Sequence, residues 1–201
     1  YSFPQEVRRK FPFRYKPNFG NLVNNVVQKL IADVIYKSKT IKETEWDRDY
    51  NVCFQSEIDI LNQSPPVDEK DKQGRQQMIK FAEDAIPITK KVVQEIMGKD
   101  KLVCEKYIEV KEELMIKPII GRVDYETKTK FIELKTKPPN LKKVKNKDEW
   151  NMITQELPDE PTIENLTQTS FYYVATGKIP FLVYVNDKDY VIFDQSHELM
   201  K

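Results

Sequence analysis

The sequence predicts an α/β fold in which a central mixed sheet of about four to six strands is flanked by helices. Apolar residues recur at helical spacing in two stretches, 20–36 and 163–176. Between these stretches, residues 119–137 have the pattern of two strands rich in Ile, Val, Phe and Tyr, joined by a polar turn. A length of 201 residues suits one sizeable core, so we expect residues 1–201 to form a single domain.

The N-terminal part is expected to be an arm followed by a core helix. Residues 1–18 carry Pro4, Pro12 and Pro17 among aromatic and basic residues, which predicts an irregular arm. The helix is expected over residues 20–36. Its buried face is predicted from the helical spacing of six residues: Val23, Val26, Val27, Leu30, Ile31 and Val34.

Residues 37–98 are polar and mixed, and we expect them to form a helical insertion between the first helix and the sheet. Apolar spacing predicts one helix around residues 46–61 and another around residues 78–85. Pro87 is expected to end the second, because proline lacks the backbone N–H that a helix interior needs. Residues 88–97 are therefore expected as a separate helix.

The rest of the chain supplies the sheet and one more helix. Residues 102–110 are expected to form a strand that leads into the central hairpin. Residues 138–162 are proline-bearing and charged, so we expect a surface loop there. Near the C-terminus, apolar runs at 180–185 and 190–193 flank the turn residues 186–189, which predicts a second hairpin that closes the sheet.

The central hairpin is expected to bring two carboxylates and an ammonium group together. Side chains alternate between the faces of a strand, so Glu133 and Lys135 share a face while Ile132 and Leu134 take the other. Pairing of the two strands would place Asp124 beside them. The alternative is an ordinary hairpin with solvated charges, in a chain whose residues are 32% charged.

This grouping of residues suits phosphodiester hydrolysis. Mg²⁺ and Mn²⁺ take oxygen ligands, and one or two carboxylates, waters and a substrate phosphate complete their shell. Such an ion favours ionisation of a water molecule and neutralises charge on the phosphate. A neighbouring lysine can orient the water or stabilise the transition state. Glu105 is a candidate for an additional carboxylate at the site, and its alternative is an exposed strand residue.

Four segments resemble a known nuclease family. GRVD at 121–124 and IELKT at 132–136 are similar to the GxxD and (D/E)xK elements of the PD-(D/E)xK nuclease superfamily, in its RecB-like exonuclease branch. Residues 20–24 resemble that branch's G-x-x-x-H segment, with Asn24 in the place of the metal-holding histidine. QTSFY at 168–172 resembles its QxxxY motif, and a spacing of four puts the Gln and Tyr on one helical face.

The resemblance implies a restriction-endonuclease-like core and a metal-dependent catalytic site. Asp124, Glu133 and Lys135 are then the catalytic residues. Asp124, Glu133 and the Leu134 carbonyl would hold Mg²⁺ or Mn²⁺, with Asn24 and Glu105 as further candidate ligands. An asparagine amide is a weaker ligand than a charged group, and a helix-surface residue without a role is the alternative for Asn24.

The resemblance also implies DNA as the partner, and local charge is compatible with it. Residues 122–147 hold nine basic residues against three acidic ones, as a phosphate backbone would require. The alternative for the lysines at 142–147 is a solvated loop. Gln168 and Tyr172 could bind a phosphate or back up the catalytic residues, and Tyr172 could instead be a core residue. The expected DNA contacts are Arg122, Lys137, Lys142, Lys143, Gln168 and Tyr172.

The function implied is a DNA exonuclease acting on free ends in recombination, repair or degradation. The alternatives are an endonuclease for branched or specific sites, and a catalytically weak nuclease-fold module that only binds DNA or a partner. Overall charge gives no indication of nucleic-acid binding, because 33 basic residues nearly balance 32 acidic ones.

The cysteines and apolar segments bear on cofactors and location. Cys53 and Cys104 alone cannot supply a disulfide framework or a Cys₄ metal cluster, so we expect a reducing compartment inside a cell. The resemblance to phage-type and mitochondrial genome-maintenance exonucleases implies a cytoplasm, the host cell of a phage or a mitochondrial matrix. No apolar run approaches membrane-spanning length and no signal peptide is visible, so no membrane partner is expected. His197, the only histidine, lies in a polar tail and is expected to have no chemical role.

Overall fold

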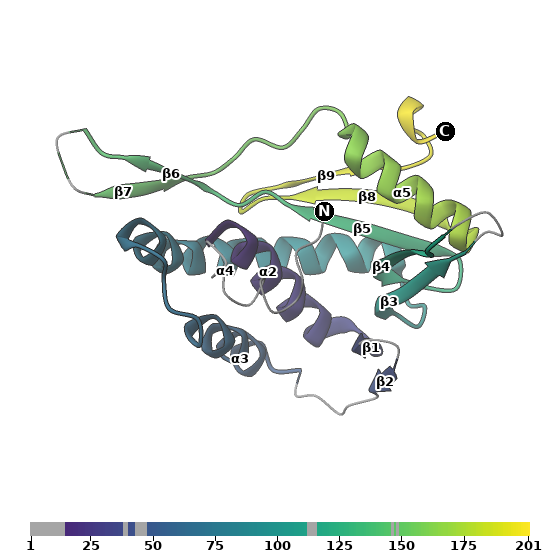
Figure 1. The fold of residues 1–201 in the computed structure, drawn as a ribbon, viewed down its shortest axis with the longest axis horizontal. Coiled ribbons are helices and arrows are strands. Elements are labelled where there is room, and N and C mark those ends of the chain that lie inside the picture. The colour runs from purple at the N-terminus through teal and green to yellow at the C-terminus, as the bar shows by residue number, and fades with distance from the viewer. Residues whose placement is uncertain (1–14, 38–39, 43–47, 112–115, 146, 148) are drawn as a thin grey trace.

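A seven-stranded mixed sheet forms the centre of the protein, as the computed structural model shows for residues 15–37, 40–42, 48–111, 116–145, 147 and 149–201 (Figure 1). The strand order is β2-β1-β3-β4-β5-β8-β9. β1 is parallel to β3 and β5 is parallel to β8, whereas the other neighbours are antiparallel. The strands are β1 (Val34–Lys37), β2 (Thr40–Lys42), β3 (Val103–Val110), β4 (Ile119–Glu126), β5 (Lys130–Thr136), β8 (Ile179–Val185) and β9 (Tyr190–Phe193).

Helices cover both faces of this sheet. One face carries α2 (Tyr15–Ile31), α3 (Tyr50–Asn62) and α4 (Glu69–Met97), and the other carries α5 (Ile163–Thr176) (Figure 1). The chain ends with a short 3₁₀ helix, η1 (Glu198–Met200). The expected α/β class with a mixed sheet flanked by helices is therefore confirmed, with seven strands in place of four to six.

The alternation of side chains along β5 separates the two cores. Ile132 and Leu134 belong to the larger core, which α2 and α4 share with the sheet. Phe131 instead packs with Tyr172 of α5 in a smaller core on the opposite face. Glu133 and Lys135 have the same parity as Phe131, so the strand presents its charged pair toward α5.

The first helix begins and ends earlier than the sequence predicted. It runs over Tyr15–Ile31 instead of 20–36, and it therefore takes in the last residues of the expected arm. Pro17 is tolerated in the first turn, where backbone N–H groups have no intrahelical partner. The β-branched residues Val34 and Ile35 pair with β3, because strand pairing there satisfies their backbone groups. Residues 1–14 of the expected arm lie outside the described residues.

Pro87 does not divide the helix in which it lies, so the expectation of two separate helices over 78–97 was wrong. The single helix α4 runs from Glu69 to Met97 and is capped at its C-terminus by Gly98, whose φ is 68°. Pro87 and Glu83, whose carbonyl loses its N–H partner, are both exposed, so water can replace the missing hydrogen bond. Buried residues on both sides of the proline hold the helix together: Ala82, Ala85, Ile86, Val92 and Val93.

The segment expected to be a helical insertion contributes to the main core. Its helices α3 and α4 both pack against α2, and α4 also contacts β5, β8 and β9. The described part of the segment also contains the short strand β2. Trp46, which had been assigned to the first of these helices, lies outside the described residues.

The expected loop over 138–162 contains a second, two-stranded sheet. Strands β6 (Asn140–Lys143) and β7 (Trp150–Ile153) pair as an antiparallel hairpin. This hairpin projects beyond the end of the central sheet (Figure 1). The sequence signal was weak because each strand has only four residues and carries few apolar side chains. The other late elements, α5 and the β8–β9 hairpin, lie where they were predicted.

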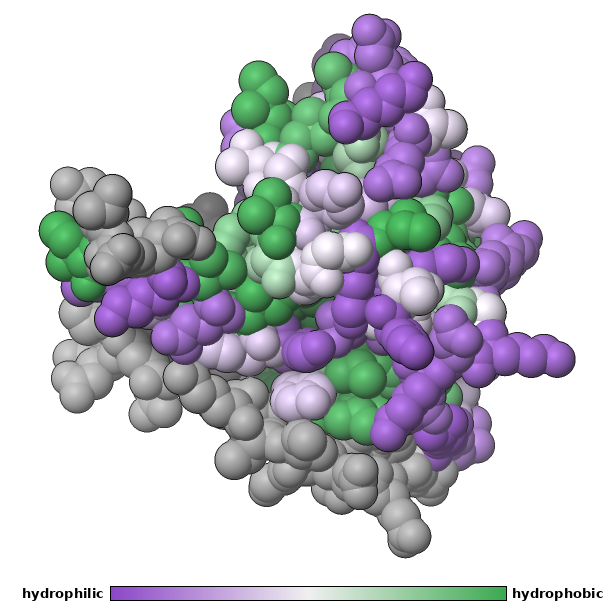
Figure 2. All heavy atoms as spheres, turned by 90° about the vertical axis from the view of Figure 1, so that its right-hand side faces the viewer, coloured by the Kyte–Doolittle hydropathy of each residue, from purple (hydrophilic) through white to green (hydrophobic). Residues whose placement is uncertain are grey.

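The surface carries scattered apolar side chains. Ile119, Ile120 and Val174 are among the exposed large hydrophobic residues. On the end of the molecule seen in Figure 2, apolar patches are interspersed with hydrophilic side chains. Among the described helices, none is both long and apolar enough to cross a bilayer.

Candidate active site

The candidate site lies where β4 and β5 separate. Their ladder consists of only two pairs, Tyr125 with Ile132 and Glu126 with Phe131. Beyond it, Oδ2 of Asp124 accepts a hydrogen bond from the backbone N–H of Leu134 at 2.8 Å. The carboxylate therefore takes the place that a β4 carbonyl would occupy in a continuous ladder. In a strand the N–H and C=O of one residue point the same way, so the Leu134 carbonyl faces this gap too.

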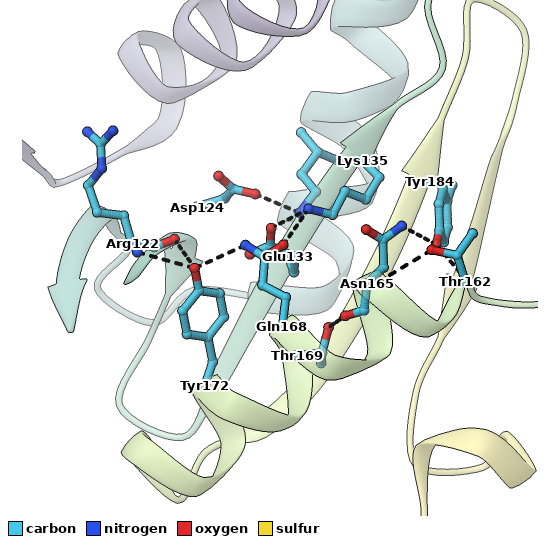
Figure 3. A network of polar contacts seen from close by, with 11 residues as sticks. Arg122, Asp124, Glu133, Lys135, Thr162, Asn165, Gln168, Thr169, Tyr172 and Tyr184 are labelled. Atoms are coloured by element: carbon cyan, nitrogen blue, oxygen red, sulfur yellow. Dashed lines mark hydrogen bonds and ion pairs between the residues drawn. The ribbon is translucent and has the colours of Figure 1, made fainter. Parts of the chain in front are cut away.

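Tyr172 of α5 satisfies the backbone that the separation leaves unpaired. Its hydroxyl donates to the Arg122 carbonyl at 2.8 Å and lies 3.2 Å from the Arg122 N–H, which donates to it (Figure 3). The ring is buried against Gly121, where a Cβ would lie only 2.4 Å from Cε1 of the tyrosine. Gly121 is thus needed for the close approach of Tyr172. This contact gives a physical reason for the glycine of the GxxD-like segment and for the tyrosine of the QxxxY-like segment.

Gln168 connects this tyrosine to the charged pair. Its Nε2 donates to the Tyr172 hydroxyl at 3.0 Å, and its Oε1 accepts from Nζ of Lys135 at 2.8 Å. Nζ of Lys135 also donates to Oε1 of Glu133 at 2.7 Å (Figure 3). The lysine is therefore fixed between a carboxylate and an amide oxygen. Tyr172 is thus a core residue, as one of its alternatives required, and its hydroxyl also joins Gln168 to the backbone of Arg122.

The first turns of α5 are fixed in turn by β8. The hydroxyl of Tyr184 accepts from Nδ2 of Asn165 at 2.5 Å and from the N–H of Thr162, the residue that caps α5, at 3.3 Å. Tyr184 itself is fully buried and packs edge-on against Phe193. Because Gln168 lies one turn further along α5, this anchor sets its position over the site.

The two carboxylates of the site lie close together, and their negative charge is only partly offset by neighbouring groups. Burial raises the pKa of Asp124 well above its ordinary value, and the neighbouring Glu133 charge raises it further. Burial also raises the pKa of Glu133, although Lys135 opposes this effect. The same hairpin shows the contrast: the buried Glu126 is paired with two ammonium groups, at 2.7 and 3.0 Å.

The site residues fit a hard divalent cation. Oε2 of Glu133 is buried and has no hydrogen-bond partner among the described residues. An unpaired buried carboxylate oxygen is costly unless a cation or a donor satisfies it. Within the described residues, no three His, Cys, Asp or Glu side chains are placed to hold a metal ion together. Asp124, Glu133 and the Leu134 carbonyl offer instead the small ligand set that Mg²⁺ accepts when waters and a phosphate complete its shell.

Glu105 lies close enough to act on both carboxylates electrostatically. Its charge raises the pKa of Asp124 and of Glu133. Oε1 of Glu105 accepts from Nε2 of Gln28 at 2.8 Å, and Oε2 lies 3.4 Å from Nη1 of Arg122. With φ at 57°, Glu105 is the one non-glycine residue in the described chain with a positive φ, a conformation that costs energy for a glutamate. Its role as a metal ligand stays a prediction.

Asn24 is tied to the strand that carries Asp124. Its Oδ1 accepts a hydrogen bond from the hydroxyl of Tyr125 at 2.5 Å. Four residues before it, Gly20 packs so closely on β5 that a Cβ would lie 2.8 Å from Oγ1 of Thr136. The amide oxygen is thus engaged by protein, and no contact between Asn24 and the carboxylates themselves is present in the described structure.

Sequence reasoning missed Gln28 and Tyr125. Gln28 is buried and supports Glu105, and Tyr125 is fully buried and supports Asn24. A signal for Gln28 was available, because Gly20, Asn24 and Gln28 are spaced by four and therefore line one face of α2. Tyr125 gave no such signal, since a strand tyrosine next to Asp124 is fully explained as a core residue.

The other predicted side chains are exposed or make contacts of their own. Arg122 is exposed, and Lys137 lies with Nζ 5.1 Å from the ring centroid of Tyr184. Lys142 and Lys143 are exposed on β6. His197 caps η1, where its Nδ1 accepts from the N–H of Leu199. The two cysteines, Cys53 and Cys104, are free and buried.

Comparisons with known proteins identify no relative. No family model, no curated protein and no solved structure matches this chain. The likeness to nucleases therefore rests on the four motifs and on how their residues are arranged.

The fit of Gly121 against Tyr172 can be tested by a double-mutant cycle. We expect Gly121→Ala to lower the free energy of unfolding by about 1–3 kcal/mol, because the added methyl group collides with a buried ring. In a Tyr172→Ala background the collision is absent, and the same substitution should cost little or even stabilise the strand. Urea denaturation of the four proteins gives the answer. An equal cost in both backgrounds would contradict the proposed close packing.

The charge on Asp124 should destabilise the metal-free protein at neutral pH. A raised pKa in the folded state means that stability is highest below the unfolded pKa, about 3.9, and is lost as the pH rises through the folded value. We therefore expect Asp124→Asn, measured in EDTA, to raise the free energy of unfolding at pH 8. The gain should disappear near pH 4.

The control is Asp194→Asn, which should have the opposite sign. Hydrogen bonds from Ser196 lower the pKa of Asp194, so its charge favours the folded state. Its removal should leave stability at pH 8 unchanged or reduced. If Asp124→Asn were no more stable than the wild-type protein at pH 8, the assignment of a strained carboxylate pair would be wrong.

Proposed function

We propose that this protein is a metal-dependent nuclease that hydrolyses phosphodiester bonds in DNA, and that it acts as an exonuclease. The observation that carries this proposal is the pairing of Asp124 and Glu133 beside Lys135, with one buried glutamate oxygen lacking a hydrogen-bond partner among the described residues. Such a group has raised carboxylate pKa values and an ammonium in contact, which is typical of catalytic sites. A purely structural hairpin would not need this arrangement.

The residues divide the work of the reaction between them. Asp124, Glu133 and the Leu134 carbonyl would hold Mg²⁺ or Mn²⁺, which when bound supplies charge neutralisation at the phosphate and favours ionisation of a nearby water. Lys135 would orient that water or stabilise the negative charge of the transition state. Gln168 fixes the position of this lysine through its amide oxygen.

Support for DNA as the substrate comes from the motifs and from charge. The order of the GxxD, (D/E)xK and QxxxY segments is that of RecB-like exonucleases, which is the reason for proposing attack at a DNA end. Arg122 is 60% exposed next to the site and can meet a phosphate group. Lys137 follows the catalytic strand directly.

Digestion of end-labelled linear duplex DNA tests the proposal. Wild-type protein should degrade it with Mg²⁺ or Mn²⁺ and not with EDTA. Asp124→Asn and Glu133→Gln should abolish degradation, because each removes a formal charge from the cation site. Lys135→Ala should slow it by roughly two to four orders of magnitude, the usual scale for an acid–base or electrostatic group. Lys128→Ala, in the exposed turn of the same hairpin, is the matched control and should keep full activity.

A closed circular duplex in the same assay separates the alternatives. An exonuclease leaves the circle intact, whereas an endonuclease acting on branched or specific sites cuts it. Metal-independent retention of DNA without any degradation would identify a binding module and overturn the nuclease proposal. Near wild-type turnover of either carboxylate variant would overturn the assignment of the site.

A further inference from the structure

The hairpin of residues 140–153 is firmly held at its base. It is called the arm from here on and is distinct from the N-terminal arm expected over residues 1–18. Leu141 packs so closely on α4 that a Cβ at Gly74 would lie 2.8 Å from its Cδ1. Gln77 of α4 accepts from the N–H of Met152 at 2.9 Å and donates to the carbonyl of Trp150. Nζ of Lys16, in α2, donates to Asn140 at 2.6 Å. Two helices of the main core therefore fix the arm's direction.

The two faces of the arm differ in character. In the β6–β7 register, Leu141 lies opposite Met152, and both pack against the main core. The neighbouring pair, Lys142 and Asn151, has the opposite parity and so projects away from α4. This outward side therefore carries Lys142 and Asn151, together with the exposed Ile153.

The arm carries most of its charge at and near its tip. Residues 140–153 contain four lysines against two acidic residues, Asp148 and Glu149. All four lysines are exposed: Lys142, Lys143, Lys145 and Lys147. The arm begins four residues after Thr136, the end of the strand that carries Glu133 and Lys135, and extends from that end of the sheet (Figure 1).

We infer that the arm binds the backbone of duplex DNA and holds the duplex as its end enters the site, an inference that rests on the proposed nuclease function. A two-stranded β-ribbon fits the major groove of a duplex, and lysines neutralise its phosphates. Proteins that bind single strands stack bases on exposed aromatic rings. The arm's only aromatic residue, Trp150, already has Nζ of Lys70 4.7 Å from its ring centroid. The arm therefore suits a duplex better than a single strand.

Binding measurements without cleavage test this inference. A fluorescein-labelled blunt duplex and a single strand of equal length are titrated with protein in EDTA, over a series of salt concentrations. The arm variant is Lys142→Gln, Lys143→Gln, Lys145→Gln and Lys147→Gln combined. The control variant removes four exposed lysines from the opposite end of the molecule: Lys91, Lys99, Lys101 and Lys128. Unchanged thermal stability of both variants shows that the fold is intact.

The arm variant should bind the duplex about tenfold or more weakly near physiological salt. The slope of log affinity against log salt should fall by about 2–4, because roughly 0.9 of a counterion is released per phosphate contact. The control variant should change neither quantity, and the single strand should be affected less than the duplex. Equal effects of the two variants, or an unchanged slope, would overturn the inference. An equal loss for the single strand would overturn the choice of duplex.

Cleavage in Mg²⁺ separates this inference from the function on which it rests. Both proteins are compared at limiting protein concentration. If the arm variant degrades the linear duplex as well as the wild-type protein does, the role of the arm is overturned and the nuclease proposal stands. If the wild-type protein binds the duplex through the arm but cuts no DNA, the nuclease proposal is overturned and the arm remains a DNA-binding element.

Discussion

The hydrogen bond from the Leu134 N–H to Asp124 is the interaction on which the candidate site depends. It ends the β4–β5 ladder after two residue pairs and places a carboxylate where a backbone carbonyl would otherwise lie. Glu133, on the adjoining strand, brings a second carboxylate to the same gap. Burial raises the pKa values of both groups and the Glu133 charge raises that of Asp124 further, so the fold retains an electrostatic cost at this point. A hydrophobic pair at these positions would stabilise the metal-free fold better.

The surrounding elements keep this gap open and ordered. Tyr172 satisfies the backbone of Arg122 and is accommodated only because residue 121 is a glycine. Gln168 carries the same network on to Lys135, and α5 is itself anchored on β8 through Tyr184. On the other face, Gln28 supports Glu105 in a conformation that is unfavourable for a glutamate. A positive φ at Glu105 and a buried Glu133 oxygen without a hydrogen-bond partner among the described residues therefore lie close together at this site.

Some of this was predictable from the sequence because it depends on local patterns. Strand alternation placed Glu133 and Lys135 on one face, and a spacing of four placed Gln168 and Tyr172 together. What failed depended on tertiary context. Pro87 continues a helix because its neighbours are buried and its freed carbonyl meets water, which no local rule for proline contains. The β6–β7 hairpin was missed because the short strands gain their order from α4 rather than from their own apolar content. The separation of β4 from β5 was equally invisible, since it results from one side chain competing with the backbone.

The central claim is that the Asp124–Glu133 pair is a cation site, and calorimetric titration of the protein with Mn²⁺ tests it most directly. We expect saturable binding that strengthens as the pH rises above the ordinary carboxylate range, because protons compete for carboxylates whose pKa values are raised. Asp124→Asn and Glu133→Gln should lose this binding, whereas Asp194→Asn should retain it. Binding that is absent from the wild-type protein, or unchanged in Asp124→Asn, would contradict the account.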